Sequence, residues 1–600
     1  MIVAEDVFNK RAQDIRDGLK MSVLEILEER GYINQIVGSR DDLKTLIDNR
    51  RVGVYAGVDP TAPSLHVGHM VPFMALSWLF IHGYPVYFLL GGATAMIGDP
   101  TGRLKARTAQ NHKQRKLNIA AMHMQLKRFG ETMERYAARH GYQREWAWRR
   151  ALENNSVWHG KRPIAEWMRL MLSGVRVGPM LGRDSVKNRL EKGDGMSLAE
   201  FCYPLVQAWD WWELFQKGVQ VQIGGADQFG NILQGAEAVK YAASIDHPYQ
   251  EKLKQEKIAT DIKRQEEKKE KQEGSQSLWS ETTTSAPTIT EDPLGFTVPL
   301  LTTSSGEKFG KSTGNAIWLD PDLTPPFELY QFFLRSSDTD VEKYLKLLTF
   351  MPMNEIRALM DEHTKDASKR VAQHTLAHEF VDLIHGPQAA DTAERQHRSV
   401  FNKSTTLGDI RASLCTSTNN ASIERAPPHP AVNPTSPTQS VHAHSSNSCI
   451  LPHSLVHGQH LSRILYSAGL VESRSEGGRL ITKGGAYIGS TADGKKMRDS
   501  LSYIPADMQK ARWEVLQGWL IGGEEGGDGE ELLILRTGKW RVKIVRIIDD
   551  KEFTRKGLTA PGWDQIEGKP LEDDGKRSNE AREKYRARRR TEVRSGSQAL

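Results

Sequence analysis

The sequence predicts an α/β protein whose first large domain is built on a parallel sheet. Strand-like segments at 52–58, 84–90 and 219–223 alternate with helical segments, and such alternation is typical of βαβ units with parallel strands. Glycine-rich stretches follow two of these strands, at 91–102 and 224–231. Because ligands bind at the carboxyl ends of parallel strands, these stretches mark the predicted site of chemistry.

Composition narrows the class of protein. The 600 residues are enough for several domains, and 38% of them are hydrophobic. No apolar run approaches the roughly 20 residues of a membrane helix, so we expect no membrane partner. The cysteines Cys202, Cys415 and Cys449 form no Cys-x-x-Cys motif, which indicates a reducing compartment and neither a disulfide framework nor a protein-built metal site.

The amino terminus is predicted to be helical. Residues 1–50 show mixed charge with apolar spacing, and we interpret them as an N-terminal helical extension. The first 20 residues hold four basic and four acidic groups, unlike the acid-poor composition of a mitochondrial presequence. Either there is no presequence or this start is incomplete.

The strand at 52–58 leads into a predicted anion site. Ser64 is placed to cap a helix that carries His66, Gly68 and His69. Backbone N–H groups and the positive dipole end at a helix N-terminus favour a phosphate, and the two histidines share one helical face. Gly68 leaves room for a flat base against the backbone. Two ordinary surface histidines are the alternative interpretation.

The second strand ends in the stretch Ile-Gly-Asp99-Pro-Thr-Gly-Arg103. Asp99 follows a buried strand directly, so we expect it at the ligand-binding edge of the sheet. Arg103 and Arg107 come shortly after it and are placed to meet phosphates. A simple turn aspartate is the alternative, since Asp-Pro and Thr-Gly are turn formers.

A mostly helical connective insertion is predicted at about 109–200, followed by a helix with a polar face. Tyr203, Gln207 and Asp210 are spaced i, i+4 and i+7, so they share one face where a purely structural helix would repeat apolar residues. Buried polar groups need partners, and a ligand is a natural one. This helix therefore belongs to the predicted site.

The strand at 219–223 ends in a Gly-Gly turn with polar side chains. Gly225 lets the backbone approach a ribose, and Asp227, with Gln228 beside it, is placed to accept from the ribose hydroxyls. Residues 251–292 then interrupt the domain with a run of Lys, Glu and Gln and a Ser/Thr-rich segment, which predicts an exposed insertion.

A lysine pair follows the next strand-like segment, 296–301. Lys308 and Lys311 lie in a Gly/Ser loop together with Ser312. By itself such a loop is usually a solvated turn. Paired with the upstream histidines, it predicts a mobile element that contacts phosphates.

The remaining chain divides into a helical region, a linker, a small domain and a tail. Residues 326–386 are predicted helical, and 387–457 are poor in regular pattern. Five histidines occur between His429 and His457, but without regular spacing or carboxylates we favour a disordered linker over a metal site.

The small domain is predicted at 458–550, as short helices followed by strands. Four basic groups are spread on it: Arg463, Arg474, Arg479 and Lys483. Residues 551–600 are predicted to be a basic disordered tail, with nine Lys/Arg against three Asp/Glu from residue 576 onward.

Five motifs together resemble the bacterial-type tyrosyl-tRNA synthetases, and most closely the mitochondrial ones of filamentous fungi. The histidine and lysine motifs resemble the HIGH and KMSKS signatures of class I aminoacyl-tRNA synthetases, in the right order and separation. The motifs are Tyr55-Ala-Gly-Val-Asp59-Pro-Thr61, Ile97-Gly-Asp99-Pro, Tyr203…Gln207…Asp210, Gln222-Ile-Gly-Gly225-Ala-Asp227-Gln228 and Lys308-Phe-Gly-Lys311-Ser312. Chance agreement across all five is not credible.

The resemblance implies a fold and an activity. It implies a Rossmann-like catalytic domain with a parallel sheet at 51–325, a helical anticodon-binding domain at 326–386 and a ribosomal-protein-S-four-like α+β RNA-binding domain at 458–550. The implied enzyme is a tyrosine–tRNA ligase that uses ATP with Mg²⁺, binds tRNA(Tyr), acts as a homodimer and is located in the mitochondrial matrix. The alternative is a factor that binds group I intron RNA in splicing, alone or in addition to the ligase.

The resemblance also implies a role for each site residue. Tyr55 and Asp210 would bind the phenol of tyrosine, and Asp99, Tyr203 and Gln207 its ammonium group. ATP would be bound by Asp59, Thr61, His66, Gly68, His69, Gly225, Asp227, Gln228 and Ser312. Arg103, Arg107, Lys308 and Lys311 would hold the departing pyrophosphate.

Overall fold

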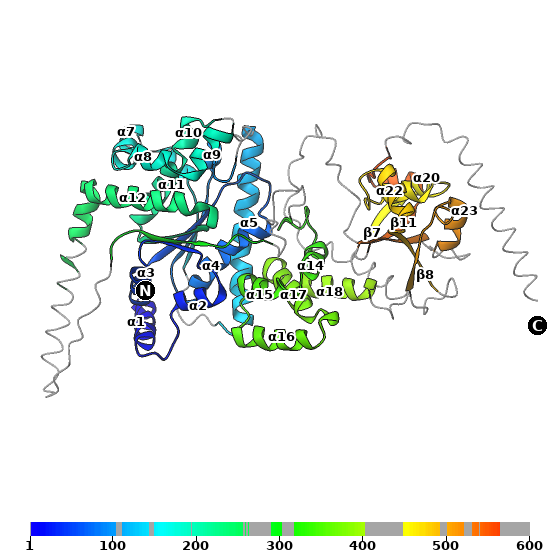
Figure 1. Cartoon of the computed structure of the whole chain (residues 1–600), viewed down its shortest axis with the longest axis horizontal. Helices are drawn as coiled ribbons and strands as arrows, with labels where there is room; N and C mark the ends of the chain where they lie inside the picture. The colour runs from blue at the N-terminus through cyan, green and yellow to red at the C-terminus, as the bar shows by residue number, and fades with distance from the viewer. Residues whose placement is uncertain are drawn as a thin grey trace, which may run out of the picture. The chain divides into compact units, whose positions relative to one another are not determined.

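The computed structural model describes residues 2–103, 111–142, 149–161, 163–193, 195–255, 258–259, 262, 290–302, 317–401, 448–491, 501–520, 531–538 and 541–563. The chain forms two compact units, Met1–Asp391 and Thr392–Leu600. Each is described by itself below (Figure 1).

The first unit is built on a six-stranded sheet with the order β1-β6-β5-β2-β3-β4. Its strands are β1 (Gln35–Val37), β2 (Gly53–Val58), β3 (Val86–Leu90), β4 (Arg150–Asn154), β5 (Val219–Gly225) and β6 (Leu294–Val298). All neighbouring pairs are parallel except β1 with β6. Every residue of β3 and β6 is buried, as expected for strands whose two faces are both covered by other elements.

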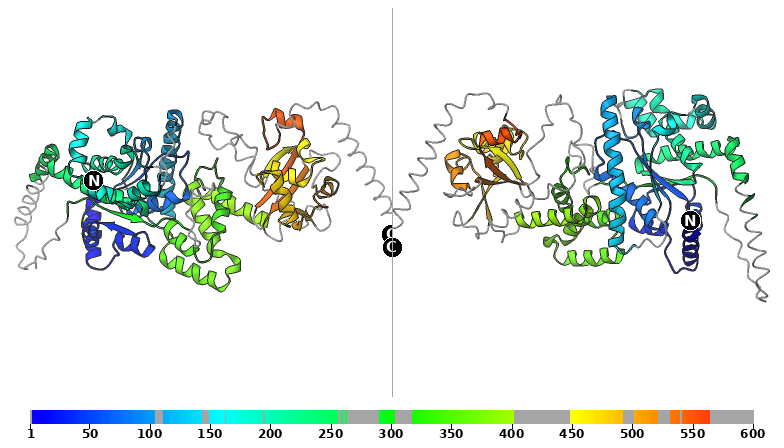
Figure 2. Two further views of the ribbon diagram at one scale, coloured as in Figure 1. Left: turned by 45° about the horizontal axis from the view of Figure 1, so that its top comes forward. Right: turned by 180° about the vertical axis from the view of Figure 1, so that it is seen from behind.

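Helices surround this sheet, as the two further views show (Figure 2). Those before the polar-faced helix are α1 (Ile2–Arg16), α2 (Val23–Arg30), α3 (Arg40–Asn49), α4 (Met70–Ile81), α5 (His112–Arg139), α6 (Ser156–His159), α7 (Ile164–Trp167), α8 (Val177–Leu181), α9 (Asp184–Lys192) and α10 (Leu198–Phe201). A π-helix, Met168–Leu172, follows α7. Next come α11 (Tyr203–Phe215) and α12 (Phe229–Ile245). Short 3-10 turns occur at Val67–His69, Thr94–Met96 and Ala226–Gln228.

The structure confirms the predicted α/β class and adds two strands at the edges of the sheet. β1 lies inside the segment predicted as purely helical, 1–50, and makes the sheet mixed because it runs antiparallel to β6. β4 lies inside the insertion predicted as mostly helical and pairs with β3. Both are short edge strands with partly exposed residues, so neither carries the alternation or the apolar run that signals a strand.

A set of helices follows the sheet in the chain. They are α14 (Pro326–Leu334), α15 (Val341–Leu348), α16 (Met353–Lys365), α17 (Val371–His385) and α18 (Pro387–Phe401). One of them, α17, packs against α5. Figure 1 shows α5 as a long helix that runs past the sheet towards α15 and α17.

A charged cluster joins α5 to α17. Arg139 forms ion pairs with Glu379 and Asp382, and Glu379 also accepts from the Tyr136 hydroxyl at 2.5 Å. His140 Nε2 lies 2.8 Å from the same carboxylate. Burial opposes ionisation of Glu379, but the hydrogen bonds from His140 and Tyr136 outweigh it and lower the pKa of that carboxyl. The cluster therefore fixes the helical region on α5 by buried charge as well as by packing.

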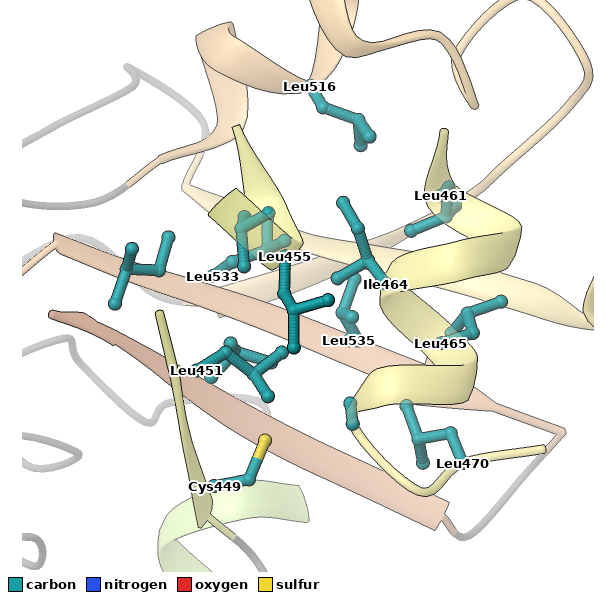
Figure 3. Packing of buried hydrophobic residues seen from close by; sticks show 14 of the residues in the cluster. Cys449, Leu451, Leu455, Leu461, Ile464, Leu465, Leu470, Leu516, Leu533 and Leu535 are labelled. Carbon is teal, nitrogen blue, oxygen red and sulfur yellow. The ribbon is translucent and has the colours of Figure 1, made fainter. Parts of the chain in front are cut away.

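The second unit has a five-stranded sheet with the order β7-β11-β10-β8-β9. The strands are β7 (Ser448–Pro452), β8 (Ala486–Thr491), β9 (Leu501–Pro505), β10 (Glu531–Thr537) and β11 (Arg541–Ile548). Its helices are α20 (His453–Val456), α21 (Leu461–Ser467), α22 (Arg474–Thr482), α23 (Trp513–Leu516) and α24 (Asp550–Arg555). Leu451, Leu455, Ile464 and Leu533 pack together in its core (Figure 3).

The structure corrects the predicted limits of the linker and the tail. Residues 387–401 are helical, and 448–457 form β7 and α20 instead of a disordered linker. In the predicted tail, Phe553 and Trp563 are buried in the second unit's core. The apolar residues of these segments occur singly or in short runs such as Leu455-Val456, which are too short to show a periodicity. Residues 402–447 and 564–600 lie outside the described part of the chain, as does the insertion between 263 and 289.

Candidate active site

The two predicted histidines lie together at the end of β2. Their rings stack with centroids 3.6 Å apart, and the backbone N–H of His66 donates to His69 Nδ1 at 3.2 Å. His66 is extended, and only His69 lies in the 3-10 turn before α4. The prediction that both occupy one helix face is therefore wrong, although the two imidazoles do meet.

Ser64 does not cap a helix. Its hydroxyl donates to the carbonyl of Leu65 at 2.7 Å and accepts from the backbone N–H of Asp320 at 3.1 Å. Gln125 of α5 supports the same segment, since its side-chain oxygen accepts from the backbone N–H of Leu65 at 3.0 Å. Ser64 and Gln125 thus hold the histidine segment in an extended conformation, and Ser64 does not act as a helix cap.

The segment that follows the lysine loop pairs with the histidine segment. Val67 donates to the carbonyl of Ile317 at 3.1 Å, and Leu319 donates to the carbonyl of Leu65 at 2.8 Å. Lys308, Lys311 and Ser312 lie outside the described residues. The described chain therefore resumes after them directly beside His66.

Tyr55, on β2, presents a buried hydroxyl. The side chain is 1% exposed, and its hydroxyl makes no hydrogen bond within the described part of the chain. Burial raises the pKa of Tyr55 well above its ordinary value, and the nearby Asp210 carboxylate raises it further. The hydroxyl is therefore a neutral group that can donate to a ligand or accept from one.

Asp210, on α11, is a buried carboxylate held by three donors. Trp158 Nε1 and His159 Nε2 each lie 2.8 Å from Oδ1, and Asn155 Nδ2 donates to Oδ2 at 3.0 Å. A carboxylate offers about four acceptor positions. Three are occupied, so one acceptor position remains on Oδ2 for a donor that comes from a ligand.

A second polar network lies at the ends of β3 and β5. Gln228 donates to Asp99 Oδ2 at 2.7 Å, and Asn231 donates to Gln228 at 3.1 Å and to Gln207 at 3.3 Å. Arg183 of the connective insertion donates to Asn231 at 2.5 Å. Burial lowers the pKa of Arg183, and Asp99 partly offsets this. The predicted residues Asp99, Gln207 and Gln228 are thus brought together.

Tyr203 contacts a residue that the sequence assigned to another role. Its hydroxyl donates to Asp59 Oδ2 at 2.8 Å, and Asp59 Oδ1 accepts from Thr94 at 2.6 Å. Burial, followed by the charge of Asp59, raises the pKa of Tyr203 well above its ordinary value. Gly91 packs against this pair, because a Cβ there would lie 2.0 Å from Asp59 Oδ1.

The other predicted residues that the structure describes are less buried than Tyr55 and Asp210. Thr61 and Gly68 are partly buried, Gly225 ends β5, and Arg103 and Asp227 are exposed. Arg107 lies outside the described residues.

The predicted RNA-binding residues lie on two neighbouring helices of the second unit. Arg463 belongs to α21, where burial lowers the pKa of its guanidinium and Arg474 lowers it further. Arg474, Arg479 and Lys483 are exposed on α22 and at its end. These four residues place several cations on one pair of helices.

Seven supporting residues were missed from the sequence. They are Thr94, Gln125, Asn155, Trp158, His159, Arg183 and Asn231. The one signal for these residues in the sequence was the polar pair Asn154-Asn155 at the end of an edge strand. Asp99 was predicted as a site residue from a similar place after a strand.

Comparison with known proteins identifies the families and relatives that this chain matches. The family model "tRNA synthetases class I (W and Y)" matches residues 47–402, and the model "Tyrosyl-tRNA synthetase C-terminal domain" matches 439–565. The mitochondrial tyrosine–tRNA ligase of Podospora anserina is 39% identical over 569 residues, which cover 93% of this chain and 80% of that protein. That of Rattus norvegicus is 37% identical over 61% of this chain and 68% of its own length.

A solved structure also matches the first part of the chain. The crystal structure of a C-terminally truncated mitochondrial tyrosyl-tRNA synthetase from Aspergillus nidulans is 50% identical, covers 67% of this chain and 100% of its own, and superimposes with a TM-score of 0.57. No helix in the described residues is long and apolar enough to cross a bilayer.

Proposed function

The chain belongs to the class I tyrosyl-tRNA synthetases and is a tyrosine–tRNA ligase, and we propose that the polar residues at the ends of β2, β3 and β5 form its tyrosine- and ATP-binding site. The observation that carries this proposal is the pair of complementary buried groups, Tyr55 and Asp210. The neutral Tyr55 hydroxyl makes no hydrogen bond within the described part of the chain, and the Asp210 carboxylate has one acceptor position left.

The phenol of tyrosine fits this pair. The substrate hydroxyl donates to Asp210 Oδ2 and accepts from the Tyr55 hydroxyl, so both buried groups gain a partner. Phenylalanine has no hydroxyl and leaves both buried groups without a partner. Its binding is therefore weakened by a large factor relative to that of tyrosine. Enzymes of this class prefer tyrosine to phenylalanine by a factor on the order of 10⁵ without editing. The proposed pair of contacts agrees with a preference for tyrosine.

The ammonium group of tyrosine is assigned to Asp99, Tyr203 and Gln207. Asp99 supplies the negative charge, and Gln207 lies in the network that Asn231 and Gln228 hold together. Tyr203 is fixed by its bond to Asp59. The arrangement supports a carboxylate-centred cation site between β3 and α11.

ATP is assigned to the histidine end of the site. His66, His69 and Thr61 contact the phosphates, Gly68 leaves space for the base, and Gly225, Asp227 and Gln228 surround the ribose. Asp59 and Ser312 complete this set. Arg103, Arg107, Lys308 and Lys311 hold the leaving pyrophosphate. The pairing of Ile317 and Leu319 with the histidine segment supports the assignment of the two lysines, because the described chain resumes beside His66 shortly after them in the sequence.

The chemistry follows from positioning and charge. The tyrosine carboxylate attacks the α-phosphorus of ATP, the bond to the β-phosphate oxygen breaks, and pyrophosphate leaves. A ribose hydroxyl at the 3′ end of tRNA then attacks the acyl carbonyl, and AMP leaves. The cationic side chains stabilise charge that develops on phosphate oxygens in the transition state. Mg²⁺ accompanies ATP as its counter-ion and shares this task.

The tRNA is assigned to two regions. The helices α14–α17 serve as the anticodon-binding region, and the cations of α21 and α22 contact the phosphate backbone of tRNA(Tyr). The match of residues 439–565 to a tyrosyl-tRNA synthetase C-terminal domain supports the second assignment. We also propose a mitochondrial matrix location, on the names of the relatives.

The enzyme is proposed to act as a homodimer. Large apolar side chains are exposed on the connective insertion: Val157, Ile164, Met168, Val177, Leu181, Leu190 and Leu198. Such a concentration of exposed apolar residues is typical of a protein interface. The intron-splicing role is not required by these observations, since α1 carries three acidic and three basic residues and so presents no excess positive charge to RNA.

The proposal is tested by exchange of labelled pyrophosphate into ATP, with tyrosine, phenylalanine and tryptophan supplied separately and no tRNA present. Exchange with tyrosine alone is expected. Asp210→Ala should raise the tyrosine KM by at least about 100-fold, since a buried charged acceptor is lost. An unchanged KM would remove Asp210 from the substrate site.

A further inference from the structure

The second unit holds a cluster of two histidines and a carboxylate at one edge. His453 and His457 lie one turn apart at the two ends of α20, and Glu531 is the first residue of β10. One possible ligand atom from each of the three side chains lies within 4.8 Å of the others. Such a trio is a known donor set for zinc.

The topology of the sheet brings these distant residues together. Leu451 of β7 and Glu531 of β10 both pair with Ile547 of the intervening strand β11, from opposite sides. The chain leaves β7 and enters α20 immediately afterwards, which carries the two histidines towards the start of β10. Glu531 lies far from both histidines in the sequence, so the carboxylate absent from the histidine-rich segment comes from another strand.

The cluster is rigidly supported. Leu455 and Val456, between the two histidines, are fully buried in the core, and Asp550 accepts from the backbone N–H of Ser454 at 3.1 Å. The Trp513 ring lies 4.9 Å from the His457 ring. Fixed backbone at both histidines reduces the entropy that a ligand must overcome to order them.

Two imidazoles lie beside the one carboxylate. His457 Nε2 lies 2.9 Å from Glu531 Oε2, with side chains 16% and 24% exposed. The ring of His453 lies 4.7 Å from that of His457. Two histidines and one glutamate are a ligand set that zinc sites in proteins use.

We propose that His453, His457 and Glu531 form a binding site for a divalent transition-metal ion, with Zn²⁺ as the ion that best suits two imidazoles, one carboxylate and a water molecule. Tetrahedral bonds of about 2.0–2.2 Å place ligand atoms about 3.3 Å apart, so side-chain rotations must draw the ligand atoms together. The site connects α20 to β10 and so stabilises the second unit. It departs from the prediction of no protein-built metal site, and it does not depend on the proposed active site.

The test measures Co²⁺ and Zn²⁺ binding to the full chain, purified without a histidine tag. His429, His442 and His444 are changed together to Asn in the parent protein, so that the other histidines of the histidine-rich segment do not contribute. We expect one Co²⁺ per chain, with a visible absorption spectrum of low coordination number that Zn²⁺ abolishes. His453→Gln, His457→Gln and Glu531→Gln should each weaken binding at least about tenfold.

The matched control is His378→Gln. His378 pairs with Asp391 at 3.0 Å in the first unit, so it repeats the histidine–carboxylate contact outside the cluster, and its loss should leave binding unchanged. Thermal unfolding of the second unit should shift upward with Zn²⁺ in the parent but not in the three variants. Absence of Co²⁺ and Zn²⁺ binding by the parent at about 100 μM free metal overturns the proposal, whatever the variants do. Equal binding by the parent and all three variants also overturns it.

Discussion

His159 donates a hydrogen bond to Asp210 across 2.8 Å, from a short helix that the sequence does not mark as part of the site. Together with Trp158 it occupies both acceptor positions of Oδ1, so the proposed contact with the phenol of tyrosine falls to Oδ2. This geometry makes His159 a positioning residue for the proposed phenol contact.

Replacing His159 should therefore affect tyrosine binding through Asp210. We expect His159→Leu to raise the tyrosine KM roughly tenfold to 100-fold, because a hydrogen bond to a charged acceptor is lost. His159→Gln can still donate and should restore most of the affinity. Pyrophosphate exchange measures both, and the ATP KM should stay unchanged. Equal defects in the Leu and Gln variants would contradict the hydrogen-bonding role.

Tyr55→Phe should separate stability from specificity. The hydroxyl is buried and makes no hydrogen bond within the described residues, so its removal should leave the free energy of unfolding unchanged or raise it by up to about 1 kcal/mol. The preference for tyrosine over phenylalanine should fall at least about tenfold. Urea unfolding and exchange assays measure the two effects. A clear loss of stability would show that the hydroxyl has a structural partner.

The pH dependence of stability should depend in part on His82. Burial lowers the pKa of His82 to about 3, and Arg11 adds to this. Below pH 6.5 the unfolded chain takes up a proton that the folded chain rejects, so stability falls with pH until about pH 3, by about 1.4 kcal/mol per unit. His82→Gln keeps a donor for the carbonyl of Trp78 and should flatten this fall.

Urea unfolding at several pH values in that range measures the slope. His112→Gln, at an exposed histidine that begins α5, is the matched control and should leave the slope unchanged. If His82→Gln has the parent slope, protonation of His82 does not contribute to acid unfolding.

A chain that ends after Phe401 should still activate tyrosine but should charge tRNA poorly. The proposed active site lies within Met1–Asp391, whereas the basic residues of α21 and α22 are lost. Pyrophosphate exchange should persist, and aminoacylation should fall at least about tenfold because phosphate contacts are removed. Full charging by this shortened chain would place tRNA binding in the first unit alone.

Ile164→Asp should disrupt the proposed dimer. Ile164 is 75% exposed on the connective insertion, and a charge buried in an apolar interface is strongly unfavourable. Sedimentation should then show a monomer. Leu19→Asp, at a residue that is also 75% exposed but lies outside this insertion, is the control. A monomeric parent protein would refute the dimer directly.

The central part of the fold could be predicted because most residues of its strands are buried and its apolar residues recur. β2, β3 and β5 lie where the sequence predicts strands, Asp99 lies in the loop after β3, and Gly225 ends β5. Short strands at the sheet edges, β1 and β4, carry no comparable signal, because partly exposed residues do not alternate. β7 and α20 were missed for another reason: they are short, and they are stabilised by the core of the second unit.

The site was predictable where polar residues repeat on one face and not where support comes from elsewhere. Tyr203, Gln207 and Asp210 are marked by helical spacing. Asn155, Trp158 and His159 reach Asp210 from β4 and α6, more than fifty residues away in sequence. Only the three-dimensional fold sets such distances, so a single sequence does not reveal these donors.

The long helix α5 connects two regions of the first unit, the histidine segment and α17. Its 28 residues correspond to about 42 Å of unbroken helix. Gln125, near its middle, holds the histidine segment, and Arg139, at its end, holds α17. One continuous helix therefore contacts both the proposed ATP end of the site and the helices proposed to meet the anticodon. We expect a displacement of α17 to reach the histidine segment through this helix.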